Sequence, residues 1–188
     1  MNTVTVVDYG MGNLLSVCRA LENQGAEVIL SAQPADIEKA ERIVLPGVGA
    51  FADGMRALDE RGLSDALRRA AAAQTPLLGI CLGAQMLLDS SEEFGEHAGL
   101  GLIPGKVLAI PASSADGNKL KVPHMGWADL LPANDENFAH PLLADTAPGS
   151  AVYFVHSFQA HPQRAEDITA ISDYAGNALT AMIAHKNV

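Results

Sequence analysis

The sequence has few of the features that mark whole classes of protein. Two cysteines, Cys18 and Cys81, are too few for a disulfide framework. Twelve Lys and Arg residues against 22 Asp and Glu residues give a formal charge of -10, which argues against nucleic acids and anionic membranes as partners. No apolar run reaches the ~20 residues needed to cross a bilayer. The first ten residues, MNTVTVVDYG, also lack the cationic start of a secretory signal. We therefore expect a protein of the cytoplasm.

The chain has enough apolar residues for one substantial core. Its 188 residues are 48% hydrophobic, which favours a single domain over residues 1–188. Short β-branched and apolar runs alternate with helical patterns in the first half. The expected strands are 3–7, 26–30, 42–45 and 76–80, the last of them fully buried. The expected helices lie within 13–25 and over 53–73. Asn13 and Gly25 would bound the first helix, and Gly62 would break the second, with Ser64 capping its second part. Apolar strands separated by helices predict a parallel sheet covered on both sides.

The second half of the chain has a different pattern. Its expected strands, separated by loops rich in Pro, Gly, Asn and Asp, are 106–110, 119–122, 127–131, 152–156, 168–171 and 178–183. Helical patterns are scarce, so we expect partly antiparallel additions to the sheet. The chain closes on a strand pattern and a turn, with no covering helix after them.

The most specific local signal is Gly79-Ile80-Cys81-Leu82-Gly83, between a buried strand and an apolar helix. It is the cysteine form of the nucleophile elbow, in which glycines allow a tight turn and the nucleophile projects above the sheet. A helix N-terminus favours the reactive thiolate, and the N–H of Leu82 could donate to an oxyanion. The alternative is that Cys81 is a small buried apolar residue. Cys18 lies on an apolar helix face, where core packing is expected.

Several segments together resemble one family. Residues 76–85, PLLGICLGAQ, are similar to the active-site segment of class I, triad-type glutamine amidotransferases. Four further segments resemble the glutaminase subunits of imidazole glycerol phosphate synthases, namely DYGMGNL (8–14), LPGVGAF (45–51), PHMGW (123–127) and YFVHS (153–157). The resemblance implies a flavodoxin-like, mostly parallel sheet flanked by helices. It also implies hydrolysis of glutamine to glutamate and ammonia, with the ammonia passing to a cyclase subunit that makes imidazole glycerol phosphate in histidine biosynthesis.

The same resemblance implies roles for individual residues. Cys81 would attack the side-chain amide of glutamine, and Val48, between Gly47 and Gly49, would supply a second oxyanion N–H beside that of Leu82. The residues expected to line the glutamine pocket are Gly47, Gly49, Gln85, Glu93, His156, Ser157 and Phe158. Phe158 departs from the tyrosine expected there. Without the resemblance, Glu93 would be taken as a solvated surface charge.

The triad His and Glu of this family lie in a His-Pro-Glu motif on the strand after a segment like residues 185–188. Neither residue is present in these 188 residues, and the last strand and its covering helix are absent too. His161-Pro162-Gln163 is no substitute, because it comes two strands too early and glutamine cannot orient an imidazole by charge. We expect a C-terminally incomplete amidotransferase domain, inactive as it stands. Either a longer natural enzyme or a shortened docking homologue would explain it.

The segment PHMGW contains the single tryptophan, Trp127. Composition alone favours a place for it in the core. The resemblance instead places Met125 and Trp127 against the cyclase, a (β/α)₈ barrel. Neither paired cysteines nor His-x-x-x-His occur, so the sequence predicts no metal site and no cofactor. Another Cys-dependent hydrolase of the superfamily is a further alternative.

Overall fold

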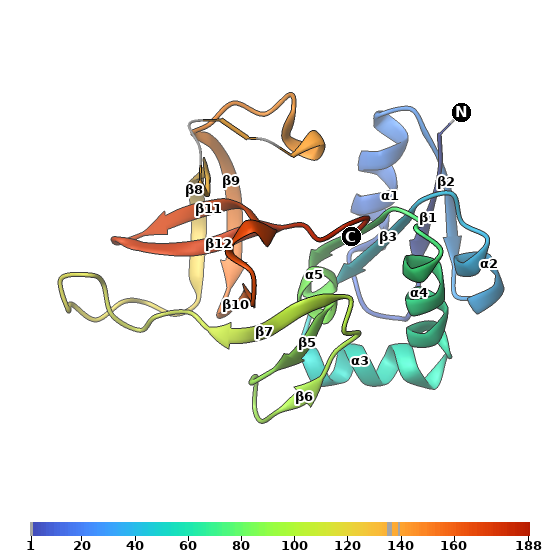
Figure 1. The fold of residues 1–188 in the computed structure, drawn as a ribbon, viewed down its shortest axis with the longest axis horizontal. Coiled ribbons are helices and arrows are strands. Elements are labelled where there is room, and N and C mark those ends of the chain that lie inside the picture. The colour runs from blue at the N-terminus through green and yellow to red at the C-terminus, as the bar shows by residue number, and fades with distance from the viewer. Residues whose placement is uncertain (1, 135–136, 139) are drawn as a thin grey trace. The chain divides into compact units, whose positions relative to one another are not determined.

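The structure, a computed structural model, describes residues 2–134, 137–138 and 140–188 (Figure 1). By their internal contacts the residues divide into unit 1, Met1–Pro104 with His185–Val188, and unit 2, Gly105–Ala184. In the part of the chain that the structure describes, no helix has both the length and the apolar character that a membrane crossing requires.

Unit 1 is built on a four-stranded parallel sheet. Its strands are β1 (Asn2–Val7), β2 (Ala26–Ser31), β3 (Ile43–Gly47) and β4 (Leu77–Cys81), in the order β2-β1-β3-β4. This is the start of a doubly wound, flavodoxin-like order, in which ligands bind beyond the carboxyl ends of the strands. A short antiparallel pair, β5 (Leu88–Ser91) and β6 (His97–Ala98), follows. The predicted fold class, a mostly parallel sheet with antiparallel additions, is confirmed.

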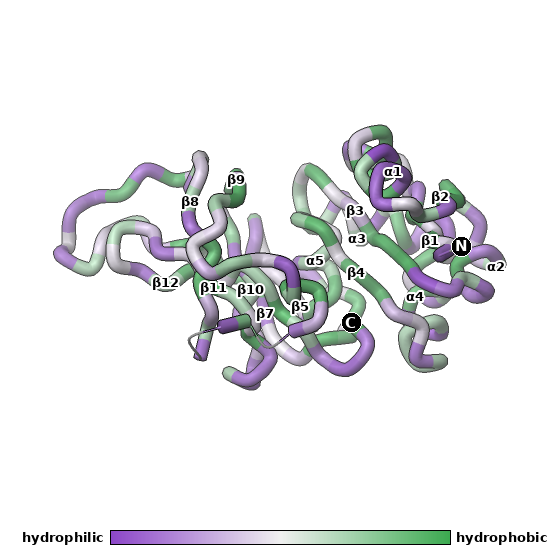
Figure 2. Tube along the Cα trace, turned by 90° about the horizontal axis from the view of Figure 1, so that it is seen from above, coloured by the Kyte–Doolittle hydropathy of each residue, from purple (hydrophilic) through white to green (hydrophobic). Residues whose placement is uncertain are grey.

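Helices cover both faces of this sheet, as predicted. The helices are α1 (Leu14–Asn23), α2 (Pro34–Glu38), α3 (Phe51–Glu60), α4 (Leu63–Ala72) and α5 (Leu82–Met86). Figure 2 shows α1 and α4 on opposite sides of the strands. The apolar side of α1, which includes Cys18, packs on Val4, Val6 and Val44, so the predicted packing role of Cys18 is confirmed. Asn13 accepts the Ser16 N–H at 3.4 Å, and it caps α1 as expected.

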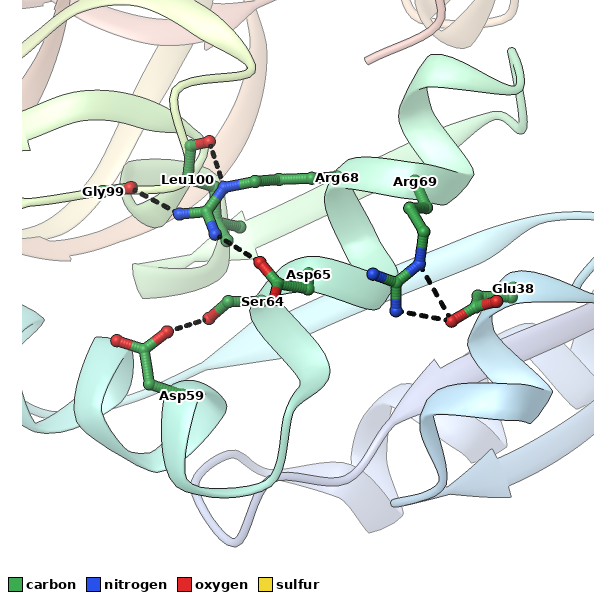
Figure 3. Close-up of polar contacts among 8 residues, drawn as sticks. All are labelled: Glu38, Asp59, Ser64, Asp65, Arg68, Arg69, Gly99 and Leu100. Carbon is green, nitrogen blue, oxygen red and sulfur yellow. Dashed lines mark hydrogen bonds and ion pairs between the residues drawn. The ribbon is translucent and has the colours of Figure 1, made fainter.

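Polar contacts tie α4 to its neighbours (Figure 3). The Arg68 guanidinium donates to the carbonyls of Leu100 and Gly99, at 3.0 and 3.3 Å, and it pairs with Asp65 on its own helix. Ser64 does not cap α4, because the N-cap position is Gly62 in the left-handed conformation. Ser64 is instead buried within the first turn of α4, and its hydroxyl donates to Asp59 of α3. The prediction for Ser64 was therefore wrong, since a glycine can make the turn without a side-chain cap.

β4 is less buried than its apolar sequence predicts. Leu78 and Ile80 are each 37% exposed, whereas Leu77 is buried. Among the described strands β4 pairs only with β3, so it lies at the edge of the sheet. At its start, the Leu77 N–H donates to the carbonyl of Asn187 at 2.9 Å. The expectation of a fully buried strand was wrong because an edge strand lacks cover on one side.

Unit 2 is antiparallel, as the second half of the sequence predicts. β8 (His124–Pro132), β9 (Ser150–His156), β11 (Ile168–Tyr174) and β12 (Asn177–Ile183) form a sheet in the order β12-β11-β8-β9. β7 (Ile103–Ala109), in which the boundary between the units falls, pairs with β10 (Phe158–Pro162). Leu130, Leu143 and Ala170 form a small core. The expected strand at 119–122 is absent, since only an isolated bridge joins Lys119 to Ser113.

Candidate active site

Cys81 lies at a sharp turn between β4 and α5, with φ 55° and ψ −119°. A residue with a side chain rarely adopts positive φ, and such strain collects at functional sites. The flanking glycines are required by contact: a Cβ on Gly79 would lie 2.5 Å from the Ala84 Cα, and one on Gly83 would lie 1.8 Å from the Leu45 carbonyl oxygen. Cys81 itself is exposed, so its interpretation as a buried apolar residue is wrong. The predicted elbow is present in the structure.

The segment Gly47–Gly49 starts beside this turn. Gly47 ends β3 as the register partner of Cys81, and it is buried. A Cβ on Gly47 would lie 2.6 Å from the Tyr9 hydroxyl and 2.8 Å from the Gly83 nitrogen, so glycine is required here too. Val48 is 50% exposed, and Gly49 has φ 101°. The structure thus brings the predicted oxyanion loop and the predicted nucleophile to neighbouring strand ends.

Glu93 is held in place in unit 1. Its Oε2 accepts the backbone N–H of Phe51 at 2.6 Å, and its own N–H donates to the Ser91 hydroxyl at 3.1 Å. Glu93 is part-buried, so the interpretation as a solvated surface charge is wrong. Gln85 lies one helical turn after Cys81 on α5 and is also part-buried.

His156, Ser157 and Phe158 lie at the junction of β9 and β10 in unit 2. The His156 Nδ1–H donates to the Phe158 carbonyl at 3.0 Å, because a carbonyl can only accept. In the neutral ring Nε2 is then the acceptor, and it accepts from Nδ1 of His124 at 3.1 Å. Burial lowers the pKa of both imidazoles. His156 is thus neutral, with both ring nitrogens engaged inside unit 2.

Comparison with known proteins agrees with this geometry. The profile of the family described as glutamine amidotransferase class-I matches residues 5–188. The chain belongs to the class-I glutamine amidotransferases. A relative from Legionella pneumophila (strain Lens), named imidazole glycerol phosphate synthase subunit HisH 1, is 44% identical over all of this chain and 89% of its own. A HisH subunit from Geobacillus thermodenitrificans is 46% identical over 93% of this chain and 79% of its own. A crystal structure described as a glutamine amidotransferase has the same fold, with TM-score 0.66 and 19% identity over 89% of this chain and 79% of that one.

One residue beside the Cys81 turn has no role that its sequence pattern predicts. Tyr9 is fully buried in unit 1, and among the described residues its hydroxyl has no hydrogen-bond partner. Burial, and then the charge of Cys81, raise the pKa of Tyr9 well above its usual value, so the phenol keeps its proton. The only signal in the sequence was its place in the segment Asp8–Leu14. Nothing in a local pattern shows that its hydroxyl would lie 2.6 Å from a Cβ on Gly47.

The two residues predicted at a partner interface lie on β8 of unit 2. Met125 is 56% exposed and Trp127 is 73% exposed, so Trp127 is not the core residue that composition suggested. Directly opposite on β9, their partners Val155 and Tyr153 are also more than half exposed. The Trp127 and Tyr153 rings meet edge to face at 5.6 Å. These four side chains, Met125, Trp127, Tyr153 and Val155, are called the β8–β9 patch below.

Proposed function

We propose that this amidotransferase chain is the glutaminase subunit of an imidazole glycerol phosphate synthase. The observation that carries the proposal is Cys81, exposed and held at positive φ between two glycines whose Cβ positions are filled. That arrangement suits a nucleophile and has no evident use in packing. The chain aligns with 79 to 89% of the length of the two HisH relatives, and their names supply the pathway, histidine biosynthesis.

The chemistry proceeds in two steps. The Cys81 thiol gives up its proton as its sulfur attacks the side-chain amide carbon of glutamine. The carbon–nitrogen bond of the resulting tetrahedral intermediate breaks, that proton passes to the nitrogen, and ammonia leaves. Water then attacks the glutamyl thioester, which releases glutamate and restores the thiol. The N–H groups of Leu82 and Val48 would stabilise the oxyanion in both steps. Leu82 begins α5, where helical amides lack partners within the helix.

Substrate recognition is assigned to the polar side chains near this turn. The Glu93 carboxylate would bind the α-ammonium of the substrate glutamine. The side-chain amide of Gln85 would bind the substrate's remaining polar groups. Gly47 and Gly49 would let the loop approach closely. The family resemblance also assigns His156, Ser157 and Phe158 of unit 2 to glutamine binding. A phenylalanine at 158 provides ring contact without a hydroxyl donor.

The partner is proposed to be the cyclase subunit, a (β/α)₈ barrel that receives the ammonia. The β8–β9 patch supports this assignment. Exposed aromatic residues with a methionine are typical anchors of protein interfaces, and four large apolar side chains on one face of two strands form a contiguous surface. We place the pair in the cytoplasm, a compartment that keeps thiols such as Cys81 reduced.

Alkylation by a chloroketone analogue of glutamine tests the function on the chain itself. In this reaction the Cys81 sulfur displaces chloride, and no triad base is required. We expect one equivalent of label on Cys81, protection by glutamine, and no label on Cys81→Ser, whereas Cys18→Ser should label like the wild type. Labelling of Cys81 that is no faster than with iodoacetamide and is unaffected by glutamine would refute a glutamine site.

A further inference from the structure

Glu93 reaches across 42 residues to the first turn of α3. Its Oε2 accepts the N–H of Phe51, the first residue of that helix, at 2.6 Å. The N-cap position is Ala50, which has no side chain able to accept. The first amides of a helix need partners from outside the helix, and a carboxylate there also meets the positive end of the helix dipole. Glu93 therefore provides the cap that the local sequence of α3 lacks.

The backbone of Glu93 is itself held in place. The Glu93 N–H donates to the Ser91 hydroxyl, and Ser91 is fully buried at the end of β5. The acidic residue that belongs to the first turn of α3 itself, Asp53, is paired with Arg56 on the surface of the same helix. Asp53 is therefore not a substitute for the Glu93 contact.

The cap lies immediately after the oxyanion loop. Three residues, Val48 to Ala50, join the end of β3 to the start of α3. At one end Gly47 is fixed by its register with Cys81, and at the other Phe51 is fixed by its fully buried ring and by Glu93. Between these ends Val48 and Gly49 are exposed. A segment so short takes its position from its two ends.

We propose that Glu93 is a positioning residue for the oxyanion loop, holding Val48–Ala50 through the Phe51 amide. The inference rests on the proposed function, in which the same carboxylate binds the α-ammonium of glutamine. A carboxylate has acceptor sites for both groups at once. Binding of an α-amino acid and the position of the loop are then coupled through one side chain. The Glu93 carboxylate that binds the ammonium of the substrate also holds the loop that carries the Val48 N–H.

Two substitutions of Glu93 separate these roles. Glu93→Gln keeps an oxygen that can accept the Phe51 N–H but loses the charge for the ammonium, whereas Glu93→Ala loses both. The experiment uses the full chain and measures amide hydrogen exchange over residues 48–54 together with the rate of Cys81 alkylation by the glutamine chloroketone. Asp53→Asn is the matched control, because it removes a charge from the same helix turn without touching Phe51.

We expect exchange at Phe51 and the following first-turn amides to rise roughly 5- to 10-fold in Glu93→Ala, as for loss of a helix cap, and much less in Glu93→Gln. Asp53→Asn should exchange like the wild type. Chloroketone labelling should slow in both Glu93 variants. Unchanged exchange in Glu93→Ala would overturn the positioning role while leaving the function intact. Wild-type labelling in both variants, with faster exchange in Glu93→Ala, would instead refute the ammonium site and keep the positioning role. If Glu93→Ala does not fold, Glu93→Gln and Asp53→Asn decide the question. Exchange at the wild-type rate in both variants supports the contact between the oxygen of residue 93 and the Phe51 N–H. Faster exchange in Glu93→Gln than in Asp53→Asn contradicts it.

Discussion

His124 and His156 face each other across β8 and β9, with Nδ1 of His124 3.1 Å from Nε2 of His156. The His124 ring also stacks on Tyr174 and Phe154, at centroid distances of 4.2 and 5.1 Å. Burial lowers the pKa of both histidines, and for His156 the proximity of His124 lowers it further. While His156 is neutral, its Nε2 accepts the Nδ1–H of His124, and only one hydrogen lies between the two rings.

This pair predicts that the free energy of unfolding falls as the pH is lowered. The unfolded chain binds protons near pH ~6.5, whereas the folded pair binds them only at lower pH. The stabilising contribution is therefore complete above that pH and is lost as the pH falls through the lowered folded-state values. Urea unfolding at pH 7.5, 6.0 and 5.0 measures it. His124→Phe, which keeps a stacked ring, should show a shallower decline, and an identical decline would contradict the role of the pair.

Gly83→Ala is expected to destabilise the fold by more than about 4 kcal/mol, or to prevent folding, because its Cβ would lie 1.8 Å from the Leu45 carbonyl oxygen. Gly117→Ala is the control. Gly117 has φ 82° but no atom within 4 Å of a Cβ, so only backbone strain of about 1 kcal/mol is expected. Urea denaturation measures both, and equal losses would show that the contact at Gly83 relaxes.

Tyr9→Phe is expected to raise the free energy of unfolding by about 1 kcal/mol, since the substitution removes a buried hydroxyl that lacks a partner among the described residues. Thermal unfolding measures the change, with Tyr153→Phe on the exposed β8–β9 patch as the control. A loss of stability in Tyr9→Phe would show that the hydroxyl has a partner in solution.

Trp127→Ala is expected to weaken binding of the proposed cyclase partner by roughly 2 kcal/mol, about 30-fold, while leaving the melting temperature nearly unchanged. Its 73% exposure explains the separation, because a side chain so exposed adds little to the fold of unit 2. Calorimetric titration with the cyclase measures the dissociation constant. An unchanged dissociation constant together with a lower melting temperature would assign Trp127 to folding instead.

The 188-residue chain is expected to show no appreciable glutaminase turnover, even with the cyclase, while its Cys81 still reacts with the glutamine chloroketone. Expulsion of ammonia needs a general acid and thioester hydrolysis a general base. His156 is unsuited to that role because both of its ring nitrogens are engaged. A coupled assay for ammonia tests this, and rates typical of active amidotransferases would assign the base to a histidine of this chain.

Local sequence alone determined much of this protein. The alternation of apolar runs and helical patterns predicted the parallel sheet and its covering helices, because burial on one or two faces leaves a periodic record in the sequence. The glycines around Cys81 predicted the elbow, since tight turns limit which residues fit. The family segments predicted the glutaminase function and the candidate residues of its site.

Only the tertiary structure decided which groups face one another. No local pattern shows that Glu93 caps a helix that starts 42 residues earlier, or that the Tyr9 hydroxyl occupies the place of a Gly47 side chain. The exposure of Trp127 and of β4 was decided in the same way, because burial depends on which strands lie alongside. Contacts of this kind join residues far apart in the chain, so the periodicity of the sequence carries no record of them.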